Sequence, residues 1–225
     1  MVESQPMNAV PEAVCNVCGY RSEEYPNGSP KLRVCPACEA FPRQRSFKQL
    51  FDEVLEPQLF GTGSWCDALL LSPGAVERSL LEAKFRKPVL SSLYQTYKGN
   101  FVKADVRDLK PFRPASFDLV TASNVIDYVP EMDQAFAAIR RVLRPTGAFV
   151  FLILEHSLLE GDAPVSVTTR KAVTGNYWPD KDAVPDVSLG KETLKGMLSA
   201  AGFQSEERVL REPLSGLRHT WWICR

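Results

Sequence analysis

The 225-residue sequence predicts an α/β fold with a parallel sheet, preceded by a small module built around cysteines. From Asp67 onward, short apolar runs alternate with helical segments, a pattern typical of a parallel sheet covered by helices on both faces. Before this region, four cysteines form two Cys-x2-Cys pairs separated by residues 19–34, a spacing typical of a zinc ribbon.

The composition indicates a soluble globular protein. The chain holds 27 basic and 27 acidic residues, so no net charge attracts it to nucleic acid or to a membrane surface. No apolar stretch approaches the roughly 20 residues of a membrane span, and residues 1–14 lack the features of a secretory signal. We therefore expect a cytoplasmic protein with reduced thiols, whose clustered cysteines bind metal.

The module is expected to cover residues 1–45 and to bind one structural Zn²⁺ through Cys15, Cys18, Cys35 and Cys38. Two residues between paired thiolates allow a tight turn to present both sulfurs to one ion, and four thiolates leave no ligand position open. The alternatives are a chance spacing, or a redox pair at one Cys-x2-Cys.

Residues 46–66 are predicted to hold a connecting helix and a linker, because their apolar residues recur on one helical face. Arg43 and Arg45 precede this segment. Their guanidinium groups suit either an anionic substrate or a solvated or module-docking role. The apolar face comprises Phe47, Leu50, Phe51, Val54 and Leu55.

The main domain is predicted to span residues 67–225. Helices are expected after Gly74 and from Met132, the second closed by Pro145 and Gly147, and a third ends at Gly202. Residues 160–189 are expected to form a turn-rich insert, in which Tyr177-Trp178-Pro179 suits either an aromatic lid or an exposed loop stabilised by the packing of its own aromatics. The predicted strands are 68–71, 89–93, 101–104, 117–122, 148–154, 205–210 and 219–224.

Polar and turn-forming residues lie at the ends of the predicted strands. In parallel sheets, ligands bind beyond the carboxyl ends of the strands, so we expect these residues to line one crevice. They are Ser72, Pro73, Gly74, Ser91, Ser92, Asp105, Ser123, Asn124, Glu155 and His156.

Four short motifs follow one another along the main domain: Asp105-Val-Arg-Asp-Leu, Ser116-Phe-Asp-Leu-Val, Asn124-Val-Ile-Asp-Tyr-Val and Arg141-Val-Leu-Arg-Pro-Thr-Gly. Together they resemble the class I S-adenosylmethionine-dependent methyltransferases, especially the type 11 group. The resemblance implies a Rossmann-like sheet of seven strands, order 3-2-1-4-5-7-6, with strand 7 antiparallel. The leader, with its cysteines and Arg43-Gln-Arg45, is similar to the zinc-binding leader of some bacterial members.

The resemblance also implies the site that binds S-adenosylmethionine. Two positions depart from the family: the first loop, at 71–75, has one glycine and no acid, and the second strand ends in Ser92 where the family has an acidic residue. Asp105 stands where the family contacts the adenine amine, and its alternative role is to cap a turn. The implied cofactor-binding residues are Ser72, Pro73, Gly74, Ser92, Asp105, Val106, Ser123 and Asn124.

Candidate catalytic residues follow the fourth and fifth strands. His156 is the leading candidate for a general base, and a hydrogen-bonded structural imidazole is the alternative. Asp127, Tyr128 and Glu155 are further candidates, and His219 is a lesser one. Cys66 and Cys224 are expected to be ordinary core residues.

The favoured function is methyl transfer to a small-molecule acceptor, a sugar or a specialised metabolite. One alternative is an RNA-base methyltransferase that grips RNA with its zinc ribbon, against which the balanced charge counts. The other is a degenerate methyltransferase fold that serves as a binding or scaffold protein, which the serine at position 92 favours. We expect neither a nucleic-acid nor a membrane partner.

Overall fold

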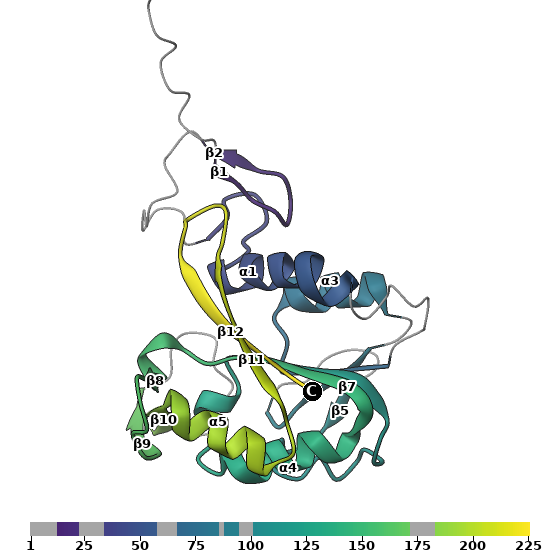
Figure 1. Cartoon of the computed structure of the whole chain (residues 1–225). Helices are drawn as coiled ribbons and strands as arrows, with labels where there is room; N and C mark the ends of the chain where they lie inside the picture. The colour runs from purple at the N-terminus through teal and green to yellow at the C-terminus, as the bar shows by residue number, and fades with distance from the viewer. Residues whose placement is uncertain (1–12, 23–33, 58–66, 86–87, 95–100, 172–182) are drawn as a thin grey trace, which may run out of the picture. The chain divides into compact units, whose positions relative to one another are not determined.

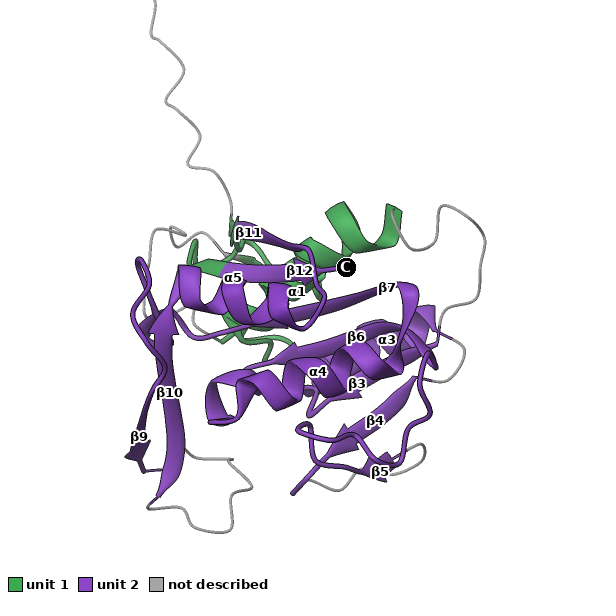
Figure 2. Ribbon diagram, turned by 60° about the horizontal axis from the view of Figure 1, so that its bottom comes forward, with its two compact units in different colours: residues 1–57, 210–219 green, residues 58–209, 220–225 purple. Residues whose placement is uncertain are grey.

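The computed structural model describes residues 13–22, 34–57, 67–85, 88–94, 101–171 and 183–225. Two compact units divide the chain, and Figure 2 colours them separately. The first unit comprises residues 1–57 and 210–219, and the second comprises residues 58–209 and 220–225. Within the described residues, no helix has the length and apolar character needed to cross a membrane.

The first unit contains a two-stranded ribbon and one long helical segment. Strand β1 (Ala13–Val14) pairs antiparallel with β2 (Arg21–Ser22). Helix α1 (Pro42–Leu50) begins with proline at its first position, and the Gln44 side chain accepts the Phe41 backbone N–H at 2.9 Å. The helix continues as a π-helical turn, η2 (Phe51–Leu55). The predicted apolar face is confirmed by the burial of Phe47, Leu50, Phe51 and Leu55.

The second unit is built on the seven-stranded sheet, in the order β11-β12-β7-β6-β3-β4-β5. Strands β3 to β7 pair in parallel, and β12 runs antiparallel to β7, so the predicted topology is confirmed. The strands are β3 (Ala68–Leu71), β4 (Val89–Ser92), β5 (Phe101–Lys103), β6 (Phe117–Ser123), β7 (Leu143–Leu152), β11 (Ser205–Arg211) and β12 (Arg218–Cys224).

Three helices accompany this sheet: α3 (Ala75–Lys84), α4 (Met132–Val142) and α5 (Lys191–Ala200). Helices α4 and α5 are in contact, and Figure 2 shows them over the same face of the sheet. Single 3₁₀ turns follow two strands: η3 (Ile126–Tyr128) follows β6, and η4 (Glu155–Ser157) follows β7. These turns therefore lie at the carboxyl edge of the sheet.

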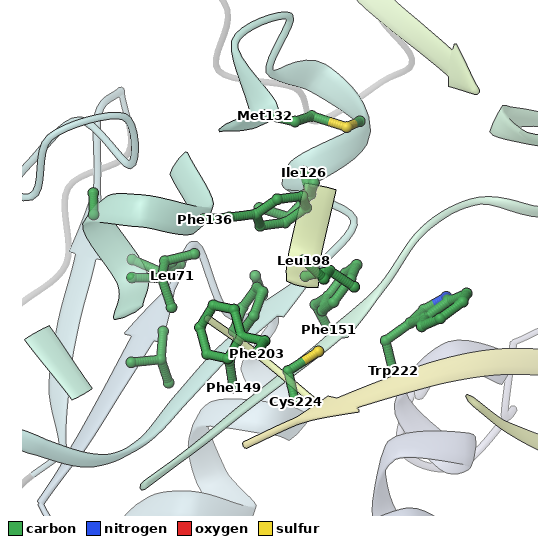
Figure 3. Packing of buried hydrophobic residues seen from close by; sticks show 14 of the residues in the cluster. Leu71, Ile126, Met132, Phe136, Phe149, Phe151, Leu198, Phe203, Trp222 and Cys224 are labelled. Atoms are coloured by element: carbon green, nitrogen blue, oxygen red, sulfur yellow. The ribbon is translucent and has the colours of Figure 1, made fainter. Parts of the chain in front are cut away.

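Aromatic side chains fill the core of the second unit, as Figure 3 shows. Phe149 and Phe151 are stacked with their ring centroids 4.6 Å apart, and Phe151 stacks on Trp222 at 6.3 Å. Phe136 reaches the same rings from α4. Cys224 is fully buried in this cluster, as predicted, and burial raises the pKa of its thiol to about 12.

The structure corrects the prediction of how the second helix of this unit ends. Strand β7 begins at Leu143, so Pro145 and Gly147 lie within a strand instead of closing a helix. A Cβ atom at Gly147 would come 3.1 Å from the carbonyl oxygen atoms of Phe117 and Asp118, which explains a glycine inside this strand.

The insert predicted as turns contains a second sheet, which is visible in Figure 1. Strand β10 (Val184–Gly190) pairs antiparallel with β9 (Ser166–Arg170) and parallel with β8 (Leu158–Leu159). The proline at position 185 argues against a strand in the sequence, because proline seldom occurs inside sheets. The proposed lid, Tyr177-Trp178-Pro179, lies outside the described residues, as does Cys66.

Candidate functional site

The four predicted metal ligands come together in the first unit. The sulfur atoms of Cys15, Cys18, Cys35 and Cys38 all lie within 4.8 Å of one another. Cys15 Sγ lies 3.8 Å from Cys38 Sγ, and Cys18 Sγ lies 3.6 Å from Cys35 Sγ. Four sulfurs at the usual Zn–S distance on a tetrahedron are separated by about 3.8 Å. The geometry therefore fits a tetrathiolate zinc site.

Both knuckles repeat one backbone arrangement. In the first, the Gly19 N–H donates to the Cys15 carbonyl at 2.8 Å, and in the second, the Glu39 N–H donates to the Cys35 carbonyl at 2.9 Å. Gly19 (φ +78°) and Glu39 (φ +58°) both adopt left-handed backbone angles. Glycine accepts these angles freely, whereas glutamate does so at some cost.

A buried ion pair lies beside the knuckles. Arg45 donates from Nε to Glu212 Oε2 at 2.7 Å and from Nη2 to Oε1 at 2.9 Å, and neither side chain is exposed. The same guanidinium donates to the Ala40 carbonyl, and the Asn16 side chain donates to the Arg45 carbonyl at 2.9 Å. Arg45 therefore joins both knuckles to the segment 210–219, and it does not receive an anionic substrate.

Glu212 was not predicted from the sequence. It accepts backbone N–H groups from Leu214 at 2.9 Å and Ser215 at 2.8 Å, together with the Ser215 hydroxyl. Burial raises the pKa of this carboxyl, but the hydrogen bonds from Arg45 and Ser215 outweigh burial, so its pKa lies below the usual value. The carboxylate is thus held in its charged form inside the unit.

His219 also lies in the first unit, and it makes the stability of that unit pH-dependent. Burial is the main cause that lowers the pKa of its imidazole, the charge of Glu212 opposes it, and the charges of Arg43 and Arg45 add to it, so that the pKa lies at about 4. The unfolded chain binds this proton below pH 6.5 and the folded unit does not, so stability is lost as the pH falls from 6.5 to 4. We expect the wild type to lose up to about 3 kcal/mol more than His219→Gln over this range.

Urea unfolding of both proteins at pH 7 and at pH 4 measures this difference. Protonation of the metal ligands and of Glu212 affects both proteins alike, so comparing them isolates the imidazole. An equal loss of stability in the two proteins would show that His219 is not buried in its neutral form.

In the second unit, a hydrogen bond links two serine hydroxyls at the ends of β3 and β4. Ser72 Oγ lies 2.9 Å from Ser92 Oγ, and the Ser72 N–H donates to the Ser91 carbonyl at 2.7 Å. Ser72 has a left-handed backbone (φ +46°), which turns the chain sharply at the end of β3. Pro73 is buried, and Gly74 opens α3 with its N–H bound to Glu77 Oε2 at 2.9 Å. Ser92 ends β4, at the position where the resemblance implies an acidic residue.

Asp105 follows β5 and binds its own neighbour. Its carboxylate accepts the Arg107 backbone N–H at 2.9 Å and the guanidinium at 2.6 Å. The side-chain hydrogen bond from Arg107 lowers the pKa of Asp105. The turn-capping role is therefore present, and 23% of the Asp105 side-chain surface remains exposed. Val106 is partly buried against the core.

Polar atoms with no hydrogen-bond partner among the described residues gather at these strand ends. They are Ser91 Oγ on β4, Ser123 Oγ on β6 and Asn124 Oδ1 after β6. Asn124 has a left-handed backbone (φ +54°). Because buried polar atoms almost always have partners, an unsatisfied group of this kind indicates a place for a ligand or an ordered water.

The predicted catalytic residues lie on η3 and η4. Asp127 is fully buried, and Tyr128 bonds through its hydroxyl to Arg170 Nη2 at 2.6 Å. Burial raises the pKa of Tyr128, the charge of Asp127 raises it further, and Arg170 opposes both.

His156 lies 3.5 Å from Asp186. This aspartate and Arg170 therefore connect His156 to Tyr128. Glu155 lies beside His156 in η4.

Sequence reasoning missed Arg170 and Asp186, because their strands were expected to be turns. The alternation of Val187 and Leu189 was the available signal, and both residues are buried.

Comparisons with known proteins agree with this geometry. A methyltransferase domain model of the type 11 group matches residues 60–151. The ubiquinone/menaquinone biosynthesis C-methyltransferase of Rickettsia felis is 30% identical over 159 residues, which cover 66% of this chain and 61% of that protein. The malonyl-[acyl-carrier protein] O-methyltransferase of Geobacter sulfurreducens is 28% identical over 178 residues, 73% of this chain and 62% of that protein. The chain thus spans about three fifths of these relatives.

Solved structures share the fold. An S-adenosylmethionine-dependent methyltransferase from Clostridium acetobutylicum superimposes with a TM-score of 0.57 at 14% identity, covering 82% of this chain and 92% of that one. The 1,6-didemethyltoxoflavin-N1-methyltransferase of Burkholderia thailandensis gives 0.53 at 17% identity, covering 83% and 90%. Residues 60–151 thus match a methyltransferase domain of the type 11 group, and the order of the seven-stranded sheet agrees with the fold of these solved structures.

Proposed function

We propose that this chain transfers a methyl group from S-adenosylmethionine to a small-molecule acceptor. The observation that carries the proposal is the set of unsatisfied polar atoms at the carboxyl ends of β4 and β6, at the edge where open α/β sheets bind ligands. The names of the relatives support it, since one is a C-methyltransferase and the other an O-methyltransferase. The Burkholderia structure contains S-adenosylhomocysteine.

The strand ends supply the residues for the cofactor. Ser72, Pro73 and Gly74 would face the methionine part, Ser92 a ribose hydroxyl, and Asp105 the adenine amine. Val106, Ser123 and Asn124 complete the set. When bound, the cofactor supplies an electrophilic methyl group on a sulfonium. The protein's contribution is alignment, because an in-line displacement depends on the placement of its reactants.

The acceptor would lie against η3 and η4. His156 is proposed as the general base for an acceptor that must lose a proton, with Asp127 and Tyr128 shaping the surroundings. We propose a sugar or a specialised metabolite as the acceptor and the cytoplasm as the site of action. The zinc ion proposed for the first unit would be structural, because its four thiolates leave no open position.

A non-enzymatic binding protein is the second candidate, and Ser92 favours it. A serine hydroxyl cannot accept both ribose hydroxyls as a charged carboxylate does, so affinity for the cofactor would be reduced. The sequence contains no acidic residue between Glu82 and Asp105 that can take its place.

Restoring the acid tests the cofactor assignment directly. Ser92→Asp is expected to tighten the binding of S-adenosylhomocysteine about tenfold, because charge-assisted hydrogen bonds are about twice as strong as neutral ones. Calorimetric titration of the wild type, Ser92→Asp and the control Ser92→Ala gives the three affinities. Absence of heat with all three proteins at millimolar ligand would refute the proposed activity. Unchanged affinity in Ser92→Asp would refute the ribose assignment alone.

A further inference from the structure

Asp186 lies at the centre of a polar network in the second unit. Its Oδ1 atom is 3.5 Å from Nε2 of His156, and its Oδ2 atom is 3.4 Å from Nε of Arg170. Arg170 in turn donates from Nη2 to the Tyr128 hydroxyl at 2.6 Å, and its guanidinium covers the Tyr128 ring at 5.2 Å. One carboxylate therefore faces an imidazole with one oxygen and a fixed cation with the other.

The network lies at the carboxyl edge of the large sheet. Strand β10, which carries Asp186, contacts both η3 after β6 and η4 after β7. The end of β6 also carries the unsatisfied Ser123 and Asn124 atoms. The second sheet thus brings two charged side chains to the acceptor side of the proposed crevice.

The imidazole of the network is more exposed than the two charged side chains, so that it is accessible to an acceptor. Asp186 is 18% exposed and Arg170 is 25% exposed, whereas His156 is 59% exposed. Asp186 Oδ1 is buried and accepts no hydrogen bond within the described part of the chain, although His156 Nε2 lies nearby. Catalytic hydrogen bonds are often long before substrate binds and tighten in the complex.

We propose that Asp186 is a positioning residue for His156. By accepting the Nε2 proton, its carboxylate leaves the Nδ1 lone pair of His156 free to remove a proton from the acceptor. The proton moves to Nδ1 and the electron pair of the broken bond stays on the acceptor atom, which attacks the methyl group while the S–CH₃ bond electrons return to sulfur. Asp186 then faces an imidazolium, which its negative charge stabilises. This inference rests on the proposed function.

Arg170 has a supporting part in this arrangement. Its contacts with Asp186 and Tyr128 hold the carboxylate in place from the side away from His156. Because both groups already engage the guanidinium, Arg170 orients the network and does not serve as the main anchor for the acceptor.

The reactivity of His156 toward diethyl pyrocarbonate tests the proposal without any acceptor. The chain contains two histidines, and His219 is largely buried, so the fast carbethoxylation phase should belong to His156 and disappear in His156→Gln. In Asp186→Asn we expect this phase to slow at least about threefold at neutral pH, because the imidazole loses its carboxylate and its preferred tautomer. The exposed Asp162→Asn serves as the matched control and should leave the rate unchanged.

Binding of S-adenosylhomocysteine to the same variants separates the two claims. Asp186→Asn should bind it as the wild type does, which also shows that the variant is folded. An unchanged carbethoxylation rate in a folded Asp186→Asn would overturn the positioning role. A wild type that binds no S-adenosylhomocysteine but shows the rate difference would overturn the proposed function and leave the His156–Asp186 pair standing.

Discussion

Cys38→Ser is expected to unfold the first unit. The four sulfurs are placed for one zinc ion, and structural zinc contributes roughly 10–16 kcal/mol of apparent free energy in small zinc domains. The ribbon beside the knuckles is short, because β1 and β2 have two residues each. We expect zinc loss and rapid backbone hydrogen exchange in residues 13–22 and 34–57. Elemental analysis and exchange mass spectrometry measure both.

Glu39→Gly is the matched control, because it changes the same knuckle without removing a ligand. Glu39 is exposed and holds a left-handed backbone angle that glycine adopts freely, so this variant should retain zinc and equal or exceed the wild type in stability. If Cys38→Ser kept its exchange protection, or if freshly prepared wild type held no zinc, the structural zinc site would be refuted.

Arg45→Met is expected to lower the free energy of unfolding of the first unit by about 3–5 kcal/mol, because it leaves the Glu212 carboxylate buried without its partner. The ion pair is fully buried and bidentate, so no solvent replaces the lost charge. The loss of the bond to the Ala40 carbonyl adds to this effect. Urea unfolding at pH 7 measures the change.

Arg43→Met is the control for a nearby arginine outside the pair. Arg43 is half-buried and stacks on the Phe41 ring at 5.2 Å, a contact that contributes about 0.5–1 kcal/mol. The double variant Arg45→Met/Glu212→Met should recover much of the lost stability, because both charges are then gone. Equal losses in Arg45→Met and Arg43→Met would contradict the structural importance of the buried pair.

The features that could be predicted are those encoded within a few residues. The spacing of Cys15, Cys18, Cys35 and Cys38 is a local pattern, and it predicted the cluster that the structure shows. The strand-end motifs are equally local, and their order along the chain implied the sheet topology that was found.

The missed features depend on contacts between distant segments. Arg45 and Glu212 are separated by 167 positions, and nothing near Glu212 identified it as the partner of a buried arginine. Arg170 reaches Tyr128 across 42 positions, from a strand that sequence reasoning assigned to a loop. Sequence spacing therefore predicted the thiolate cluster, whereas the charged partners required the fold.

Hydrogen exchange of the protein with and without S-adenosylhomocysteine tests the central claim most directly, because it locates the ligand on the fold. We expect added protection in the peptides that cover residues 72–74, 91–94, 105–106 and 123–124, at the carboxyl ends of four neighbouring strands. Protection confined to other segments, or no change at saturating ligand, would contradict a cofactor site at this edge of the sheet.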